Sequence, residues 1–310
     1  MTGRRQHYAH FYGLAPIPDD DRPLLLVHGN CQAESLRLLL AGAEVAAGAT
    51  AGSPVRSVRM PPVHELTAQD LPHLDRLLDS VDVLVSQPVA EGYRGLPVGT
   101  AEIQARAARR PRPVVVPVLR WAALHPFQVI VRSPAAGEPP LVPYHDLRVL
   151  TLAAGRPPLP EIPSAGAVRA VRDLSAQELR TRQERHASLP VVDLFLDAGA
   201  RATHTVNHPG NQVLTDLADR VLAAAGLEAE AADPGFPLLD SIHAPVLPPV
   251  LDALGLTVGD GAAREHWMVA GRRVEDAEIR DAHLRWYRAH PGVAEAGLAR
   301  HARAAEALAA

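Results

Sequence analysis

Cys31, the only cysteine of the chain, follows the apolar run Leu24–Val27 and a turn at Gly29 and Asn30. The residues after Cys31 repeat their apolar side chains with helical spacing, which predicts that the thiol lies in the first turn of a helix. Free backbone N–H groups and the positive end of the helix dipole lower the pKa of a thiol there and favour the thiolate. The position therefore predicts a nucleophile; the alternative is a small residue that fills space beneath the turn.

A thiolate nucleophile works with a base, and His208 is the first candidate. His208 follows a predicted strand at Ala200–Val206 and precedes Pro209, a residue that suits the first turn of a helix. The imidazole is then expected at the carboxyl end of a strand, where the functional residues of open α/β sheets gather. Cys31 lies at the same edge if the two strands run parallel. The alternative role for His208 is a helix cap.

Three further polar side chains follow predicted strands or loops on the same side of the sheet. The amide of Gln87, between Ser86 and Pro88, is a candidate hydrogen-bond donor to the oxyanion of a tetrahedral intermediate. His125 and His145 are candidates for orienting a substrate. Each has a structural alternative, which is a polar turn residue for Gln87 and a loop histidine with satisfied hydrogen bonds for the other two.

Apolar strands alternate with amphipathic helices in the first half of the chain, and each strand is a continuous apolar run. The predicted strands are 23–28, Val81–Val85 and Val114–Leu119, and the predicted helices are 31–47, Leu71–Ser80 and Thr100–Arg110, capped by Thr100. This alternation indicates an α/β fold with a mainly parallel sheet that helices cover on both faces.

The second half of the chain gives weaker signals. Loops rich in Pro and Gly are expected at Ala135–Pro143 and Gly155–Pro163, and Ser175–Glu178 has the pattern of a capping box that opens a helix to about Ser188. Val191–Ala198 is predicted as helix or strand, and a helix is predicted from the Asn207–Asn211 motif to Ala225. The Pro-rich segment Phe236–Pro249 is a connector or a substrate loop. A helical tail is predicted from Asp276 to Ala310, with a break at His290–Gly292. We expect an N-terminal extension at 1–22, an α/β catalytic domain at 23–228, and a connector with a helical C-terminal segment at 229–310 packed on the same core.

The composition excludes several function classes. Hydrophobic residues make up 47% of the 310 residues and aromatic residues 4%, so the core is expected to be aliphatic. The formal net charge of −4 argues against a nucleic-acid or anionic-membrane binder. The sequence contains no lysine, which excludes Schiff-base chemistry and a Walker A phosphate site.

Metal sites, disulfides and export are equally unsupported by the sequence. One cysteine allows neither an intramolecular disulfide nor a multi-cysteine zinc site, and no helical pair of histidines suggests another metal site. The N-terminus has no apolar segment typical of a signal peptide, and no stretch is long and apolar enough to span a membrane. We therefore expect a cytoplasmic protein without a metal.

Five short motifs follow one another along the chain. They are Gly29-Asn30-Cys31-Gln32, Ser86-Gln87-Pro88, His125-Pro126-Phe127 at the end of the segment that begins at Val114, Pro143-Tyr144-His145-Asp146, and Asn207-His208-Pro209-x-Asn211. In order and composition they resemble the WcbI family, which is named for a capsular-polysaccharide biosynthesis acetyltransferase. The resemblance covers roughly Leu24 to Ala225. It implies coenzyme A or an acyl-CoA as ligand, and acyl transfer to a hydroxyl of a sugar-like acceptor.

Roles for individual residues follow from this resemblance. It implies that Cys31 is the nucleophile and His208 the base. The residues that it implies around the pocket and the oxyanion are Asn30, Gln32, Ser86, Gln87, His125, His145, Asn207 and Asn211. Arg120 and Arg132 lie near the predicted sheet edge and are weak candidates for the phosphates of coenzyme A, with ordinary surface arginines as the alternative.

The layout also resembles the SGNH (GDSL-type) hydrolases, with a cysteine in place of their serine, and this implies a three-layer arrangement. The Asp that those enzymes carry three residues before the histidine is absent, because Thr205 stands there. A Cys–His dyad is then more plausible than a strict triad. The alternatives are orientation of His208 by Asn207, by Asn211 or by a backbone carbonyl.

The favoured hypothesis is ping-pong transfer of an acyl group through a Cys31 thioester to a hydroxyl or amine of a sugar-like or secondary-metabolite acceptor. A thioesterase or deacylase with the same Cys–His site is the first alternative, since water then replaces the acceptor. A non-catalytic protein that binds coenzyme A or a glycan is the second. The expected partners are a small-molecule donor and acceptor, without nucleic acid.

Overall fold

The computed structural model describes residues 3–42, 53–231, 234–257 and 265–310. The chain divides into two compact units, each formed by three separate stretches. Unit 1 contains residues 1–118, 180–194 and 211–238, and unit 2 contains residues 119–179, 195–210 and 239–310. Two of the boundaries fall inside helices, α7 (Ala165–His186) and α8 (Val192–Ala198). The domain limits expected from the sequence, at residues 22 and 228, stay a prediction.

Unit 1 is built on a four-stranded parallel sheet with the strand order β2-β1-β3-β4. Its strands are β1 (Leu24–His28), β2 (Arg56–Ser57), β3 (Val83–Ser86) and β4 (Val114–Val115). All five residues of β1 are buried, as the continuous apolar run predicts. His28 pairs with Ser86 at the carboxyl ends of β1 and β3. The turns that follow these two strands therefore meet at one edge of the sheet.

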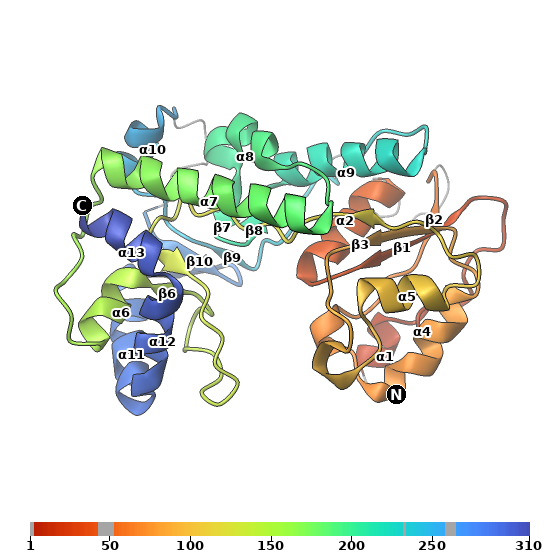
Figure 1. The fold of residues 1–310 in the computed structure, drawn as a ribbon, viewed down its shortest axis with the longest axis horizontal. Coiled ribbons are helices and arrows are strands. Elements are labelled where there is room, and N and C mark those ends of the chain that lie inside the picture. The colour runs from red at the N-terminus through yellow and green to blue at the C-terminus, as the bar shows by residue number, and fades with distance from the viewer. Residues whose placement is uncertain (1–2, 43–52, 232–233, 258–264) are drawn as a thin grey trace. The chain divides into compact units, whose positions relative to one another are not determined.

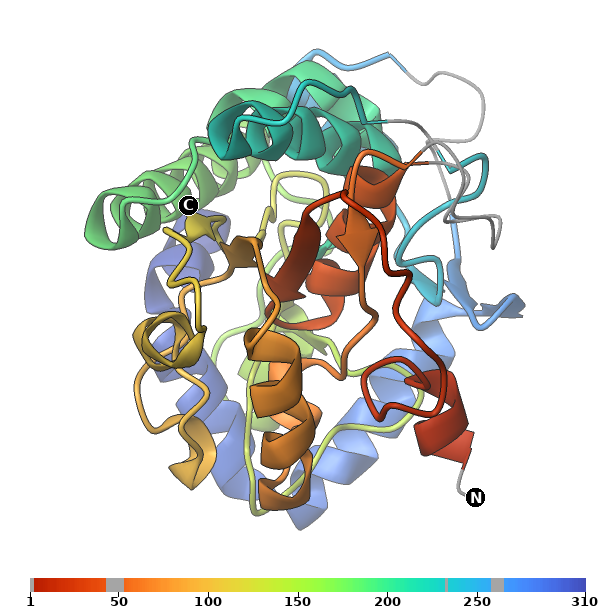
Figure 2. The same cartoon turned by 90° about the vertical axis from the view of Figure 1, so that its right-hand side faces the viewer.

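Helices cover both faces of this sheet (Figures 1 and 2). The helices α2 (Cys31–Ala41) and α9 (Asn211–Ala225) contact each other on one face, and α4 (Leu71–Leu78) and α5 (Thr100–Arg106) lie on the other. Leu24 and Leu26 of β1 pack in one apolar cluster with Leu74 of α4 and Ile103 of α5. Because successive strand residues point to opposite faces, Leu25 and Val27 face the α2 side. The predicted α/β class with a parallel sheet is confirmed.

Unit 2 combines short antiparallel strands with the C-terminal helices. The strand pairs are β5 (Gln128–Val129) with β6 (His145–Asp146), β7 (Thr203–Thr205) with β8 (His208–Pro209), and a sheet of β11 (Arg272–Val274), β10 (Trp267–Val269) and β9 (Ile242–His243). The helices wholly inside unit 2 are α6 (Leu147–Ala153), α10 (Pro248–Leu254), α11 (Asp276–Ala289), α12 (Pro291–Arg300) and α13 (Ala302–Ala309). Leu150, Tyr287 and Leu298 join α6, α11 and α12 in one core, which confirms the predicted helical C-terminal segment.

Short helical elements complete the described chain: α1 (Gly3–His7) and the 3-10 turns Val63–Glu65, Ala68–Asp70, Tyr93–Gly95 and Gly199–Arg201. Among the described residues, every helix is too short or too polar to cross a lipid bilayer.

Several element boundaries differ from the sequence predictions. The helix expected to open at Ser175 begins ten residues earlier as part of α7, and the Ser175 hydroxyl accepts a hydrogen bond from the N–H of Ala122 instead of capping. Gly99, not Thr100, is the N-cap of α5, because the Thr100 hydroxyl is used by backbone groups that follow β3. The strand expected at Val114–Leu119 ends at Val115, where its pairing with β3 ends. Residues 43–47 of the helix predicted at 31–47 lie outside the described residues.

The strand before His208 is the prediction with the largest consequence. β7 pairs antiparallel with β8 in a two-stranded sheet of unit 2, so it is not a strand of the parallel sheet that carries Cys31. The chain reverses at Val206 and Asn207, which returns His208 along β7. Pro209 belongs to β8, and α9 begins only at Asn211. His208 does follow the end of a strand, but the expectation that it opens a helix is wrong, and the strand before it is not part of the sheet of β1.

Candidate active site

Cys31 is the first residue of α2, directly after β1 and the turn at Gly29 and Asn30. Asn30 caps the helix, since its Oδ1 accepts a hydrogen bond from the N–H of Gln32 at 2.9 Å. The thiol is not in a disulfide, and the residue is half-buried. The predicted start of a helix at Cys31 is confirmed, and a half-buried thiol at this place faces the positive end of the helix dipole.

Gln87 braces this turn from the neighbouring strand. Its Oε1 accepts a hydrogen bond from the N–H of Asn30 at 2.9 Å, and its Nε2 donates to Oε1 of Gln32 at 2.9 Å. Gly29 permits the close approach, because a Cβ there would lie 2.5 Å from Oε1 of Gln87. Gln87 thus holds the backbone of Asn30 and the side chain of Gln32, the two residues that flank Cys31. Its action on an oxyanion stays a prediction.

Buried polar groups support the same turn from beneath. The Ser86 hydroxyl lies 3.0 Å from that of Thr100, and the Thr100 hydroxyl donates to the carbonyl of Gln87 at 2.9 Å. His28 is fully buried and its Nε2 donates to the carbonyl of Val98 at 2.8 Å. Burial lowers the pKa of His28 to about 4, so this ring is neutral at physiological pH. It is a structural support for the end of β1.

His208 lies in β8 of unit 2 and is 9% exposed. Burial is the main cause that lowers the pKa of His208 to about 4; the neighbouring His243 also lowers the pKa, and hydrogen bonds to the backbone of Leu239 and Ile242 oppose this. Its Nδ1 has no hydrogen-bond partner among the described residues. His208 is therefore neutral near pH 7, which is the form that accepts a proton.

A neutral network holds the turn before His208. The Tyr144 hydroxyl donates to Oδ1 of Asn207 at 2.8 Å, and the Thr205 hydroxyl donates to that of Tyr144 at 2.9 Å. The Tyr144 ring meets the His208 ring edge-on, with 6.1 Å between centroids. Thr205, at the position of the carboxylate in the hydrolase layout, thus positions Asn207 and Tyr144 without adding a charge.

The remaining predicted residues lie in several places. The His125 side chain is buried in unit 2, where its Nδ1 donates to the carbonyl of Pro245 at 3.3 Å and burial lowers its pKa to about 4. It lines a small cavity of about 110 Å³. His145 is buried in β6 and hydrogen-bonded to the Tyr287 hydroxyl, inside the core formed with α11. Asn211 belongs to unit 1, where its side chain binds the backbone of residues 236 and 238.

The two arginines proposed for phosphates differ. Arg120 is half-buried and lines the larger cavity of unit 2, whereas Arg132 is exposed and does not line it. Among the described residues, no cluster of His, Cys, Asp and Glu side chains has the arrangement of a metal site.

Residues 24–230 match the family model described as polysaccharide biosynthesis enzyme WcbI. The chain belongs to the WcbI family. It is also similar to a solved structure of WcbI, described as a novel polysaccharide biosynthesis enzyme in its native form without a disulfide bond between coenzyme A and a cysteine. The two chains are 18% identical with a TM-score of 0.74, over 93% of this chain and 98% of that one, which establishes the shared fold. No curated protein matches the chain.

A histidine cluster lies partly outside the WcbI family match and escaped the sequence predictions. His243 of β9 is hydrogen-bonded to Asp240, and the centroid of its ring lies 4.2 Å from that of His204. His243 also lowers the pKa of both His125 and His208. The sequence signal for His243 is an Asp three residues before it. Both residues lie in the segment Phe236–Pro249, which the sequence analysis interprets as a connector or a substrate loop.

Proposed function

We propose that this WcbI-family protein transfers an acyl group, acetyl in the simplest case, from an acyl-CoA to a hydroxyl or amine of a sugar-like or secondary-metabolite acceptor. The family description supports an enzyme of polysaccharide biosynthesis, and the description of the similar structure names coenzyme A and a cysteine together. The observation that carries the proposal is the position of Cys31. It is a half-buried thiol at the first residue of α2, on a turn that Asn30 and Gln87 hold rigid.

In the first step, Sγ of Cys31 attacks the thioester carbonyl carbon of the donor. The new C–S bond forms, the bond to the sulfur of coenzyme A breaks, and the released thiolate takes a proton from solvent. We expect backbone N–H groups near Cys31 and Gln32, at the positive dipole end of α2, to stabilise the oxyanion of the tetrahedral intermediate, with the amide of Gln87 assisting. Exchange between two thioesters is nearly isoenergetic, so orientation and oxyanion stabilisation are what the protein must supply.

In the second step, an acceptor hydroxyl or amine attacks the acyl carbon and Cys31 leaves as the thiolate. His208 takes the proton of the acceptor through its neutral ring. A pKa of about 4 is low for a base at neutral pH. Negative charge on a bound reactant raises the pKa of a nearby imidazole, so we expect His208 to be a stronger base in the reacting complex.

The test is intact-mass measurement of the protein after incubation with acetyl-CoA. We expect one acetyl adduct on the parent protein and none on Cys31→Ala, with Cys31→Ser as the variant that keeps a hydroxyl nucleophile in the same place. Full acyl-transfer activity in Cys31→Ala would overturn the covalent route and leave direct attack on the donor.

Two results would favour other functions. Release of free acid at the expense of acylated acceptor would make the protein a thioesterase or deacylase. Unchanged function after replacement of both Cys31 and His208 would make it a protein that binds coenzyme A or a glycan without catalysis.

A further inference from the structure

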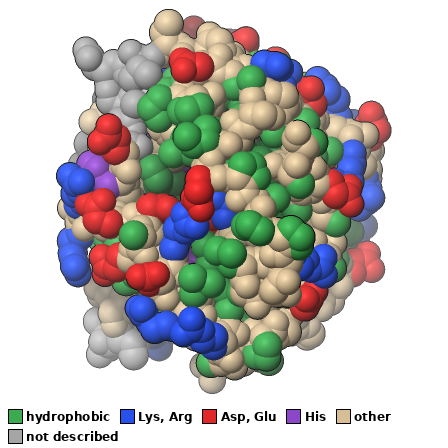
Figure 3. Space-filling model, turned by 90° about the vertical axis from the view of Figure 1, so that its left-hand side faces the viewer, with side chains coloured by type: hydrophobic (Ala, Val, Ile, Leu, Met, Phe, Trp, Pro, Cys, Tyr) green, Lys and Arg blue, Asp and Glu red, His purple; other side chains and the backbone are tan. Residues whose placement is uncertain are grey.

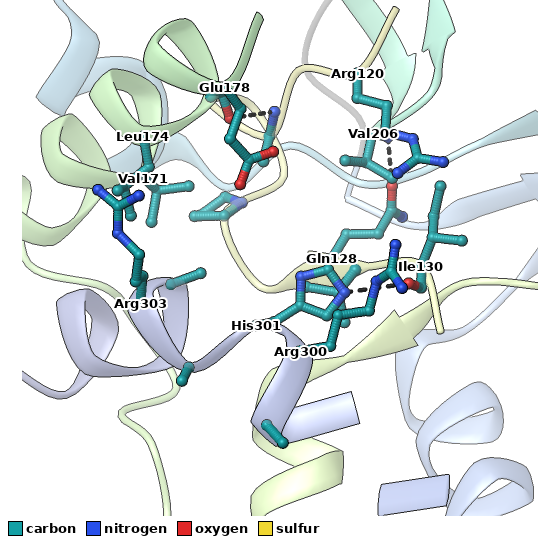
Figure 4. Close-up of a pocket in the computed structure, with 17 residues that line it drawn as sticks. Arg120, Gln128, Ile130, Val171, Leu174, Glu178, Val206, Arg300, His301 and Arg303 are labelled. Carbon is teal, nitrogen blue, oxygen red and sulfur yellow. Dashed lines mark hydrogen bonds between the residues drawn. The ribbon is translucent and has the colours of Figure 1, made fainter. Parts of the chain in front are cut away.

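The larger cavity of unit 2 has a volume of about 320 Å³, which lies within the range of small-molecule pockets. It is bounded by residues 120–130, by α7 and by the junction of α12 and α13 (Figure 4). Val171 and Leu174 of α7 and Ile130 supply apolar surface. Arg120, a weak candidate for phosphate binding from the sequence, also lines this cavity.

Basic side chains dominate the polar lining of this cavity. Arg120, Arg300 and Arg303 line it together with one carboxylate, Glu178. Arg120 is half-buried, while Arg300 and Arg303 are exposed at its mouth. Figure 4 shows Arg120 and Arg300 directed toward one another from opposite sides. Two guanidinium groups in this arrangement repel each other, and an anion between them would be attracted to both.

The pKa of His301 is affected by the positive charges of the same arginines. His301 lines the cavity, and its Nε2 donates to the carbonyl of Ile130 at 3.1 Å. Burial lowers the pKa of His301, and the positive charges of Arg300 and Arg120 lower it further against the effect of the bond to Ile130. The helix α13 begins beside His301 without an acidic residue in its first turn, so its dipole adds positive potential.

A buried amide independently points to a ligand. Gln128 is 7% exposed, and its Oε1 accepts a hydrogen bond from the N–H of Val206 at 2.6 Å. Its Nε2 has no hydrogen-bond acceptor among the described residues. Figure 4 shows this amide between Arg120 and Arg300. Buried donors are normally paired, so an oxygen-bearing group in the cavity would complete the set.

Charges are mixed on the face of the molecule that Figure 3 shows. Basic and acidic side chains are interspersed there among hydrophobic ones, without a broad area of one charge. The formal charge of the whole protein is −4, so its net field does not favour an anion, and attraction at this cavity depends on the local arrangement of its arginines.

We propose that this cavity binds the diphosphate of a nucleotide-bearing ligand, with Arg120, Arg300 and Gln128 around the phosphate oxygens and the wall of α7 against the base. Arginine suits phosphate because its planar fork donates two parallel hydrogen bonds. Two sources of this chemistry fit acyl transfer, namely the nucleotide end of the acyl donor and a nucleotide-activated sugar acceptor. The choice between them rests on the proposed function, whereas the diphosphate site does not.

The test is titration calorimetry of the full-length protein at low salt with adenosine 3′,5′-bisphosphate, uridine diphosphate and inorganic pyrophosphate. We expect Arg120→Ala and Arg300→Ala each to raise Kd for the preferred ligand about tenfold or more, the range for loss of a charged hydrogen bond. Gln128→Met should weaken binding without a change of charge, and Glu178→Gln should strengthen it. Arg285→Ala removes an exposed arginine of α11 that does not line the cavity, and it should leave Kd unchanged.

The relative affinities of the three probes identify the ligand of the cavity. Tighter binding of the adenosine ligand than of uridine diphosphate assigns the cavity to the donor, and the reverse order assigns it to the acceptor. The proposal is overturned if Arg300→Ala and Arg120→Ala, shown to be folded by their unfolding curves, bind all three probes as tightly as the parent. It is also overturned if no probe binds at millimolar concentration. Loss of acyl transfer in Cys31→Ala with unchanged Kd values keeps the two proposals separate.

Discussion

The turn that carries Cys31 is formed by neighbours that are fixed by neutral hydrogen bonds. Asn30, Gln32 and Gln87 form a closed set around the first residue of α2, in which each amide is held by another. His208 is surrounded differently, by the ring of Tyr144 and by His243, and its pKa falls because its protonated form is poorly solvated. At the level of residues, the thiol lies at the positive end of a helix dipole, whereas the imidazole lies where burial opposes its charged form.

His243→Gln tests the electrostatic part of that description. His243 lowers the pKa of His208, so its replacement by a neutral amide that retains a hydrogen-bond donor to Asp240 should raise the pKa of His208 above about 4. The measurement is an NMR titration of the histidine ring signals. If His208 is the catalytic base, the acid limb of the pH–rate profile should move to higher pH by the same amount, since the base must be unprotonated.

The control is His64→Gln, which removes an exposed histidine of unit 1. It should leave the His208 titration in place. A His208 pKa that stays constant or falls in His243→Gln would contradict the assigned neighbour effect.

At the scale of secondary-structure elements, the decisive feature is the junction of β1 with α2. Gly29 is needed there because Gln87 occupies the space of a Cβ, and the brace from β3 then fixes the direction in which α2 leaves the sheet. The same parallel pairing of β1 with β3 brings two motifs that are far apart in sequence into hydrogen-bond contact.

Gly29→Ala should therefore destabilise the protein. The new methyl group would lie 2.5 Å from Oε1 of Gln87, so the brace must move, and overpacking of this kind costs about 1–3 kcal/mol. Urea unfolding of the variant measures the loss. Adding Gln87→Ala should recover part of it, because the double variant removes the clash, and the non-additivity gives the coupling between the two positions.

Gly292→Ala is the matched control. This glycine lies in α12 with no atom within 4 Å of the added Cβ, so alanine should be neutral or mildly stabilising there. Equal losses in the two variants would show that Gly29 has no special packing requirement.

The elements of unit 1 follow from the sequence because their signals are local. Long apolar runs predict β1 and β3, and helical periodicity after Cys31 and after Leu71 predicts α2 and α4. The errors fall where the outcome depends on distant partners. The Ser175 pattern is that of a cap, but packing of Val168 and Val171 continues α7 on its N-terminal side. Strands of two residues, such as β8, exist only through pairing and leave no periodic trace.

The candidate site was predictable to the same extent. The surroundings of Cys31 lie on consecutive elements of one parallel sheet, so spacing and strand ends sufficed to place Gln87 beside it. The surroundings of His208 come from β7, from residue 144 and from β9, which are joined by antiparallel pairs and loops. His243 was missed for that reason, although its spacing from Asp240 is visible in the sequence.

On the scale of the whole molecule, each unit carries one of the two groups proposed for catalysis, Cys31 in unit 1 and His208 in unit 2. The chain enters each unit three times, so neither unit corresponds to a single continuous segment of the sequence.

Both units also contain histidines that are buried in the neutral form. Burial lowers the pKa to about 4 for His28 in unit 1 and for three in unit 2, namely His125, His145 and His208.

These histidines should make the protein unstable in mild acid. A histidine in the unfolded chain has a pKa of about 6.5, so between that value and the folded value of about 4 the unfolded state binds more protons. The free energy of unfolding therefore falls as the pH drops from about 6.5 towards 4, by up to about 1.4 kcal/mol per pH unit for each histidine.

Urea unfolding at pH 7.5, 6, 5 and 4.5 measures this slope on the full-length chain. Replacing His28 with Gln should make the slope shallower by roughly one proton even if the variant is less stable throughout, whereas His64→Gln should leave it unchanged. A slope that is equally steep in all three proteins would mean that carboxylates and not buried imidazoles govern the acid limit, because each variant differs from the parent by one titrating ring alone.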